Sequence, residues 1–541
     1  MTAENLSTAG ATTLTSTGTT SAAPPAAPDP GTAGGGGKLR VGALGLVGVL
    51  FMAVANAAPI TAMTGNVPIA IGSGNGLAAP AGFLVATVVL TLFTVGFVAM
   101  ARHITTAGGF YGFISHGLGQ VWGMASGVLA TLAYVVFEGS LIGIFSYFAS
   151  DALDQWFGWQ VDWLVLAAVG ILAVALLGYF DISVAAVVLG VFLVAEVVLL
   201  GALALSVLVK GGGPGGIVWS SLNPAKAFTG LPEGGGFGLQ GVAAGSAAIG
   251  LFFAFWSWVG FETTAVYGEE SRNPKRIVPR ATLIAVIGLG LFYTFVSWMV
   301  ISGDGARAAV AYGAKADGVG MFTSLAAQNL GGRWVVDVYL FLIVSGSFAC
   351  ALAFHNAASR YMYAIGREIP VMHRSLGATH AKHGSPHIAS LVQTAVTVVL
   401  TLAFYFLTRG GDDVTQGAYV YEYGLLAVMG TMAILIVQSI CSAAVIVYFH
   451  VRKAHPGNLL TTGIIPAIGG LGMLYVVYLL FSNLSFAGGG ASGSPFFHAI
   501  PYIVLAAFVL SAGAALWLRR ARPEVYREIG RTVLEETRER V

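Results

Sequence analysis

Charged side chains are scarce in this sequence. Only 9% of its 541 residues are Asp, Glu, Lys or Arg, whereas soluble domains average about 25%. Hydrophobic residues make up 56% of the chain. So few charges cannot cover so much apolar surface in water, which excludes a soluble protein, and the apolar content excludes disorder over most of the length.

Cysteine is nearly absent, and neither sign of charge dominates. Cys350 and Cys441 both lie in apolar runs, where two cysteines form no disulfide framework or zinc cluster and are expected to be small buried residues. The 26 basic and 24 acidic residues leave a net charge of +2, too weak a field to attract nucleic acid.

The sequence also lacks the patterns of an enzyme. Residues 236–241 spell G-x-G-x-x-G, but no strand precedes them, so a dinucleotide-binding fold is not expected. The sequence shows neither a cluster of metal-ligand spacing nor a nucleophile–base pair at a membrane interface. We therefore expect no catalytic residues, no metal and no cofactor.

Long apolar runs fill the chain after residue 38. A spanning helix needs about 20 apolar residues, whereas membrane barrels show alternating segments of about ten residues. The sequence therefore predicts an all-α polytopic membrane protein with about twelve transmembrane helices. The predicted spans are 40–56 with a continuation to 72, 81–101, 121–149, 160–180, 183–209, 240–267, 279–302, 334–362, 387–407, 420–449, 461–483 and 497–518.

The ends of the chain differ from its middle. Residues 1–37 lack the basic and apolar regions of a signal peptide and are typical of a disordered tail, while 519–541 alternate in charge as a solvated tail does. With the N-terminus inside, 20 of the 26 Lys and Arg residues fall on the inner side and the other 6 outside. The positive-inside rule then places both termini in the cytoplasm of a multi-pass protein of the cytoplasmic membrane.

Two predicted spans are interrupted. The first holds Pro59, Gly65 and Pro68 at mid-length, which break the helical hydrogen-bond ladder. The sixth combines aromatics, a serine, a glycine and a carboxylate over residues 252–262. Broken backbone at membrane depth is tolerated where it lines a cavity, and breaks five spans apart indicate two inverted five-span halves with a site between them. The alternative is ordinary kinks and packing glycines, which are common in membrane helices.

The chemistry of such a break suits an amino acid. Half-helix N-termini present N–H groups and a positive dipole end to a carboxylate, and unwound carbonyls suit an ammonium. Aromatic side chains can cover the substrate. The predicted substrate-binding residues are Ile60, Thr61, Ala62, Met63, Thr64, Gly65, Glu138, Trp256, Ser257, Trp258, Val259 and Gly260.

Three motifs carry a resemblance to a known family. GFE at 260–262, followed by the acidic pair Glu269–Glu270 and NPKR-x-VPRA from Asn273, strongly resembles the amino acid–polyamine–organocation (APC) superfamily of permeases. AGGFY at 107–111 and FHNAASRYMYA from Phe354, followed by Gly366–Arg367, also fit. The resemblance covers roughly residues 40–518.

The resemblance implies a LeuT-like fold, with a five-plus-five inverted repeat and broken helices 1 and 6. It implies a transporter domain over 38–518 that moves amino acids or amines, driven by protons or by exchange. Trp256 then resembles the aromatic gate of the sixth span, and 257–260 its unwound stretch. The first span departs from the family, because Pro59–Gly65 stands where a glycine-rich turn is common.

Three carboxylates are predicted well inside the membrane, where each costs several kcal/mol unless it is paired, hydrated or protonated. Glu138 resembles a pocket-lining position, or it is a structural hydrogen-bonding group. We hypothesise that Glu196 binds the coupling proton; the alternative is a structural partner of the first span. For Glu262 we favour a structural or inner-gate role.

The sequence thus predicts a secondary active permease of amino acids or related amines, with proton-coupled symport favoured and alternating access as its mechanism. An exchanger, a polyamine importer and a transport-inactive sensor are the alternatives. Its expected partners are the substrate, a coupling ion and the lipid bilayer, with no nucleic acid. The sequence specifies neither the individual substrate nor the oligomeric state.

Overall fold

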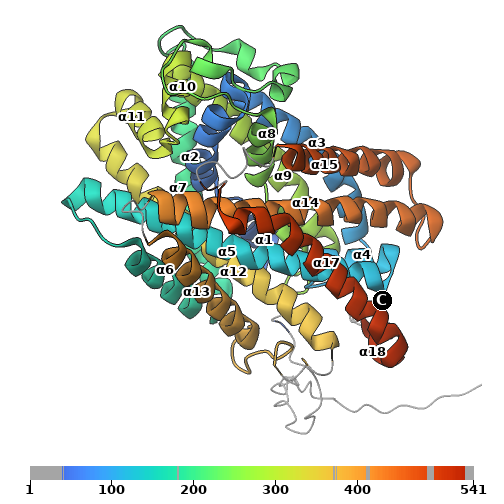
Figure 1. Ribbon diagram of the computed structural model, residues 1–541. Helices are drawn as coiled ribbons and strands as arrows, with labels where there is room; N and C mark the ends of the chain where they lie inside the picture. The colour runs from blue at the N-terminus through green and yellow to red at the C-terminus, as the bar shows by residue number, and fades with distance from the viewer. Residues whose placement is uncertain are drawn as a thin grey trace, which may run out of the picture. The chain divides into compact units, whose positions relative to one another are not determined.

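The computed structural model describes residues 39, 42–179, 182–369, 372, 375–409, 415–483, 491 and 493–530, and these form helices and connecting loops (Figure 1). The predicted tail 1–37 lies outside the described residues. Part of the predicted tail 519–541 is helical, because the last long helix runs to Ala521 and a short one follows.

The helical elements follow the predicted spans closely. In chain order they are α1 (Leu46–Ala57), α2 (Pro59–Ile69), η1 (Ala70–Asn75), η2 (Gly76–Ala78), α3 (Ala79–Ala101), α4 (Phe110–Leu118), α5 (Gln120–Phe157), α6 (Trp163–Tyr179), α7 (Ile182–Val209), η3 (Trp219–Leu222), η4 (Pro224–Phe228), η5 (Glu233–Gly236), α8 (Ala247–Trp256), η6 (Phe261–Ala265), α9 (Pro274–Asp304), α10 (Ala306–Ala314), α11 (Gly318–Leu330), α12 (Arg333–Glu368), α13 (His387–Thr408), η7 (Thr415–Tyr423), α14 (Gly424–Ile446), η8 (Val447–Val451), η9 (Leu460–Ile464), α15 (Ile465–Ser482), α17 (Pro495–Ala521) and α18 (Pro523–Glu528).

Length and composition support a membrane location. Among the described residues, nine helical segments are long and apolar enough to span a bilayer, one of them the continuous stretch Leu46–Ala101. Large apolar side chains on the outer helices are exposed, such as Val191 and Val198 on α7 and Leu510 on α17, which a bilayer accepts and water does not. The count of twelve spans stays a prediction, since α6 has 17 residues and α8 has ten.

The broken helices lie inside the bundle. Helix α1 packs against α7, α9 and α12, and α2 packs against α8, α10 and α11. Figure 1 shows α2 and α8 side by side at one end of the bundle, with α10 and α11 beside them. At another end of the bundle Leu39 packs with Tyr363 and Ala364, near the C-terminal end of α12, and Gly530 after α18 contacts both α12 and α4; we call this end the terminal face.

The first break is narrower than the sequence predicts. Helix α1 ends at Ala57, Ala58 adopts a left-handed conformation with φ 41° and ψ 76°, and α2 begins at once with Pro59. Proline at the first helical position sacrifices no hydrogen bond. Pro68 does not end a helix: it lies within α2. The predicted break across 57–68 is therefore confined to Ala58, because the backbone N–H of Ala58 still bonds to Val54 and its carbonyl accepts from Ala62.

The second break faces the first. Helix α8 ends at Trp256, a turn follows, and Gly260 has φ 117° before η6 begins. A Cβ atom at Gly260 would lie 2.3 Å from Cβ of Asn56, in the last turn of α1. The side-chain amide of Asn56 also donates to Oγ1 of Thr263 at 3.0 Å. The two breaks are thus in direct contact, a closer approach than the sequence analysis, which expects a site between them, specifies.

This contact requires glycine at position 260. Gly260→Ala adds a methyl group that overlaps Asn56 in a backbone conformation that L-residues rarely adopt, and we expect a loss of stability of about 1–3 kcal/mol. Gly288→Ala is the matched control, because nothing lies within 4 Å of its Cβ position. Thermal unfolding of the purified protein in detergent checks this. Equal midpoints for the two variants would contradict the close approach of the breaks.

Candidate functional site

A small cavity lies between the two breaks. Its volume is about 20 Å³, room for about one water molecule. The lining comes from α1, α2, α5, the α8–η6 turn, α12 and η7. The lining residues are Asn56, Ala57, Ala58, Thr61, Ala62, Asn66, Leu141, Trp256, Ser257, Val259, Cys350, Phe354 and Tyr423.

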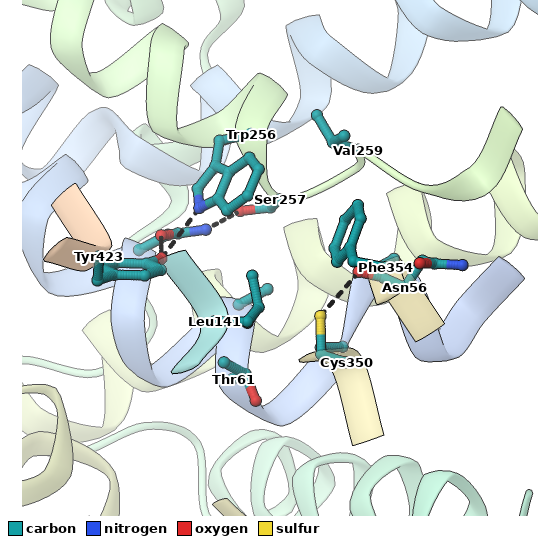
Figure 2. A pocket seen from close by; sticks show the side chains of 13 residues that line it. Asn56, Thr61, Leu141, Trp256, Ser257, Val259, Cys350, Phe354 and Tyr423 are labelled. Carbon is teal, nitrogen blue, oxygen red and sulfur yellow. Dashed lines mark hydrogen bonds between the residues drawn. The ribbon is translucent and has the colours of Figure 1, made fainter. Parts of the chain in front are cut away.

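A chain of hydrogen bonds closes one side of the cavity. Nε1 of Trp256 donates to Oη of Tyr423 at 2.9 Å, and Tyr423 donates to Oδ1 of Asn66 at 2.5 Å. The amide of Asn66 then donates to Oγ of Ser257 at 2.9 Å. Figure 2 shows this chain beside the indole of Trp256. It joins α2, the second break and η7.

The remaining walls are apolar. Leu141, Val259 and Phe354 face the cavity together with alanines of the first break. The ring of Trp256 stacks on Phe354, with centroids 6.5 Å apart. Figure 2 shows Cys350 donating to the carbonyl of Asn56, at 3.1 Å. No charged side chain is among the residues that line this cavity.

The structure brings five of the twelve predicted substrate-binding residues to the cavity wall: Thr61, Ala62, Trp256, Ser257 and Val259.

The other seven predicted residues do not line it. The Trp258 indole is fully buried and donates to the carbonyl of Val286, so it packs inside the bundle. Thr64 bonds to Tyr339 on α12 at 2.5 Å, and the carbonyl of Gly65 accepts from Tyr419. Gly260 donates its N–H to Oε2 of Glu262 at 3.0 Å. The remaining members are Ile60, Met63 and Glu138.

Glu138 has a partner that the sequence did not pair with it. Its Oε2 lies 2.9 Å from Nδ1 of His355 on α12, and Nε2 of His355 lies 2.7 Å from Oγ of Ser390 on α13. Glu138 and His355 are completely buried. This geometry matches the structural alternative for Glu138, a hydrogen-bonding group that ties α5 to α12 and α13.

Glu196 lies against the first break. Its Oε2 accepts from the backbone N–H of Ile60 at 3.4 Å, at the start of α2, and the side chain is 2% exposed. A Cβ at Gly346 of α12 would lie 2.6 Å from its Oε1. The carboxylate thus sits between α7, α2 and α12, where the positive end of the α2 dipole favours negative charge.

Glu262 lies on the side of the cavity toward the terminal face. Its Oε1 accepts from Oη of Tyr134 on α5 at 2.8 Å, while its Oε2 holds the N–H of Gly260. The ring of Tyr134 stacks on Tyr361 of α12, with centroids 5.1 Å apart. The second break is thus bonded to α5 on this side, and α5 packs on α12.

The three sequence motifs meet on the terminal face. Glu270 forms a buried two-pronged ion pair with Arg360, with Nε to Oε2 at 2.6 Å and Nη2 to Oε1 at 3.0 Å. Glu269 binds Arg367 in the same way and also accepts from the backbone N–H of Ala107 at 2.9 Å. The acidic pair Glu269–Glu270 thus binds residues of the other two motifs, the one at 107–111 and the one that begins at Phe354.

Several site residues escaped sequence reasoning. Asn66 and Tyr423 lie 357 positions apart in the sequence, and their pairing is visible only in three dimensions. Glu422 is fully buried, and Oγ1 of Thr401 donates to it at 2.6 Å. Glu422 lies at the outer end of the predicted span 420–449, so it was not counted among the carboxylates inside the membrane. The aromatic residues on both sides of it were the available signal of its burial.

Comparison with known proteins gives a consistent result. The family model described as amino acid permease matches residues 44–524. A branched-chain amino acid permease of Bacillus subtilis is 26% identical over 44% of this chain and 45% of the relative's length. An L-methionine/branched-chain amino acid exporter of Escherichia coli is 25% identical over 62% of this chain and 73% of its own.

A more distant relative is a serine/threonine exchanger of Bacillus subtilis, 21% identical over 56% of this chain and 63% of its own. The chain thus spans less than half the length of the Bacillus subtilis branched-chain permease that it matches.

The buried ion pair on the terminal face should be costly to break. Glu270→Gln leaves Arg360 buried without its carboxylate, and we expect a loss of stability of about 3–5 kcal/mol. Arg333→Gln breaks the exposed pair with Asp337, which we expect to cost less than about 1 kcal/mol. Thermal unfolding in detergent measures both. Arg360→Met, added to Glu270→Gln, removes the unpaired charge and should recover part of the lost stability. If no stability is recovered, the unpaired buried charge is not the cause of the loss.

Proposed function

The chain belongs to the amino acid permease family, and from this we propose that it is a secondary active transporter of neutral, apolar amino acids across the cytoplasmic membrane. It works by alternating access, and the cavity between the two breaks is its substrate site. The density of Lys and Arg puts the terminal face in the cytoplasm.

The observation that carries this proposal is the lining of the cavity. Small apolar residues and aromatics make up most of its lining, and its polar groups are uncharged: two side-chain amides, three hydroxyls and one thiol. A cationic side chain or a polyamine entering this wall loses its water without gaining a carboxylate, which costs several kcal/mol. A branched aliphatic side chain carries no charge, so it has no such desolvation cost. The names of two relatives, which mention branched-chain amino acids, agree with this choice.

Backbone groups supply the contacts for the two ends of an amino acid. The first turn of α2 contributes Thr61 and Ala62 to the cavity wall, and the positive end of the helix dipole there suits the substrate carboxylate. The carbonyls of Asn56 and Ala57, at the C-terminal end of α1, each accept one side-chain hydrogen bond and keep a second lone pair for the ammonium. Every amino acid carries the carboxylate and the ammonium, so these contacts do not distinguish one amino acid from another. Discrimination between side chains therefore rests with Leu141, Val259 and Phe354.

Substrate entry requires the walls to move, because the closed cavity holds about one water. The Trp256–Tyr423–Asn66 chain separates on one side and the Tyr134–Glu262 bond on the other. Alternate opening of these two barriers around a fixed site is alternating access.

Glu196 is proposed as the coupling residue. As a carboxylate it holds the N–H of Ile60 and so fixes the start of α2. When it is protonated this attraction weakens, and α2 is freer to move with the substrate. Proton binding and the position of the half-helix are then linked, which is the requirement for symport.

The substrate assignment makes a direct prediction. In proteoliposomes we expect saturable uptake of leucine, isoleucine and valine, with little uptake of lysine or putrescine. Ala62→Val narrows the cavity and should raise the KM for isoleucine more than that for alanine. Liposomes without protein are the control. Preference for lysine or putrescine would contradict the apolar-substrate assignment.

The coupling assignment makes a second prediction. Glu196→Gln should bind leucine with unchanged affinity, yet an inward proton gradient should no longer stimulate its uptake, because the amide cannot release a proton. Asp304→Asn is the control, a carboxyl group on the last residue of α9. Uptake by Glu196→Gln that still follows the gradient would reject Glu196 as the coupling site.

A further inference from the structure

The end of the described chain is fitted into the terminal face. After α17 the chain forms α18, in which Val525 is 6% exposed, and Ile529 beyond it is 1% exposed. The backbone N–H of Gly530 donates to Oε2 of Glu368 at 2.7 Å and contacts Oη of Tyr111 at 3.2 Å. Figure 1 shows α18 beside α4 near the end marked C.

The receiving site is built from two elements. Glu368 is the last residue of α12 and Tyr111 lies in the first turn of α4; the tyrosine hydroxyl donates to the carboxylate, and both side chains are buried. Gly530 has φ 73°, and a Cβ there would lie 2.4 Å from Cβ of Ser115. The space admits glycine only, so the segment is seated rather than lying loosely on the surface.

The same two elements are linked to Glu262 at the second break. Helix α12 carries Tyr361, one member of the stacked pair above Glu262, and the ion-pair residue Arg360. Helix α4 is tied to this point, because the backbone N–H of Phe110 donates to Oη of Tyr361 at 3.2 Å. Separation of α4 from the end of α12 would separate Tyr111 from Glu368, and Gly530 could no longer contact both.

We propose that residues 523–530 form a C-terminal latch that binds the closed terminal face and slows its opening. A segment that binds one of two conformations shifts the balance toward it by the difference in its binding. Here the closed arrangement supplies the hydrogen bonds of Gly530 and the burial of Ile529. Docking of the latch does not depend on which substrate is transported. The effect of the latch on the transport rate rests on the proposed function.

The latch can be tested first by thiol labelling, without transport. Ile529→Cys reports docking, because its side chain is buried when the latch is bound. A membrane-impermeant maleimide, added to inside-out vesicles, should label this cysteine slowly in the parent and about fivefold faster when Gly530→Ala is added, the effect of losing about one hydrogen bond. Gly513→Ala on α17 is the matched control, with nothing within 4 Å of its Cβ position. The chain without Ile529→Cys accounts for the native thiols. Equal labelling rates for Ile529→Cys alone, with Gly530→Ala and with Gly513→Ala would overturn the proposal.

Transport then tests the regulatory part. Gly530→Ala, and a chain ending at Arg522, should raise the initial rate of leucine uptake by about fivefold at saturating substrate, while Gly513→Ala leaves it unchanged. If Gly530→Ala speeds labelling but the initial rate of leucine uptake is unchanged or lower, the latch does not slow transport. The segment is then only a structural support. If no amino acid is transported at all, the proposed function fails, and the labelling comparison still decides whether the latch docks.

Discussion

Backbone N–H and C=O groups inside a bilayer have no water to bind, and the rest of this structure depends on how two broken helices meet that constraint. Ala58 interrupts the first span while its N–H and carbonyl both stay bonded. Gly260 interrupts the sixth, and its N–H is held by Glu262. Each break is supported by the other through Asn56. The backbone at both breaks is therefore held by hydrogen bonds from within the bundle.

Burial of charge follows the same logic. Each acidic residue between the cavity and the terminal face meets a donor from another helix: Glu262 from Tyr134, Glu270 from Arg360, Glu269 from Arg367. A buried ion pair adds little net stability, since desolvation offsets its attraction, but it strongly penalises arrangements that separate the partners. The pairs are therefore better understood as specifying one closed arrangement of η6, α4 and α12 than as a source of stability.

The sequence predicts the spans well, because an apolar run of membrane length leaves a helix as the simplest solution. It also predicts that spans one and six are broken, but not that the two breaks touch through Asn56. It does not predict that Pro68 stays helical, since that depends on how α2 packs against α11 and α12. Nor does it pair Glu138 with His355 or Tyr423 with Asn66, which lie hundreds of positions apart. Side-chain chemistry was predictable; partners, which decide whether a carboxylate faces a substrate or a histidine, were not.

In the proposed mechanism, Glu262 joins the substrate site to its exit. One oxygen holds Gly260 at the break, and the other holds Tyr134 at the barrier. A substrate carboxylate arriving at the break adds negative charge beside this group and competes for the same N–H donors, so the hold on Gly260 weakens as the substrate binds. The turn that carries Val259 is then freer to move, and with it the bond to Tyr134. A single carboxylate with two partners thus makes opening of the terminal face depend on what occupies the cavity, which a passive pore between these helices would not need.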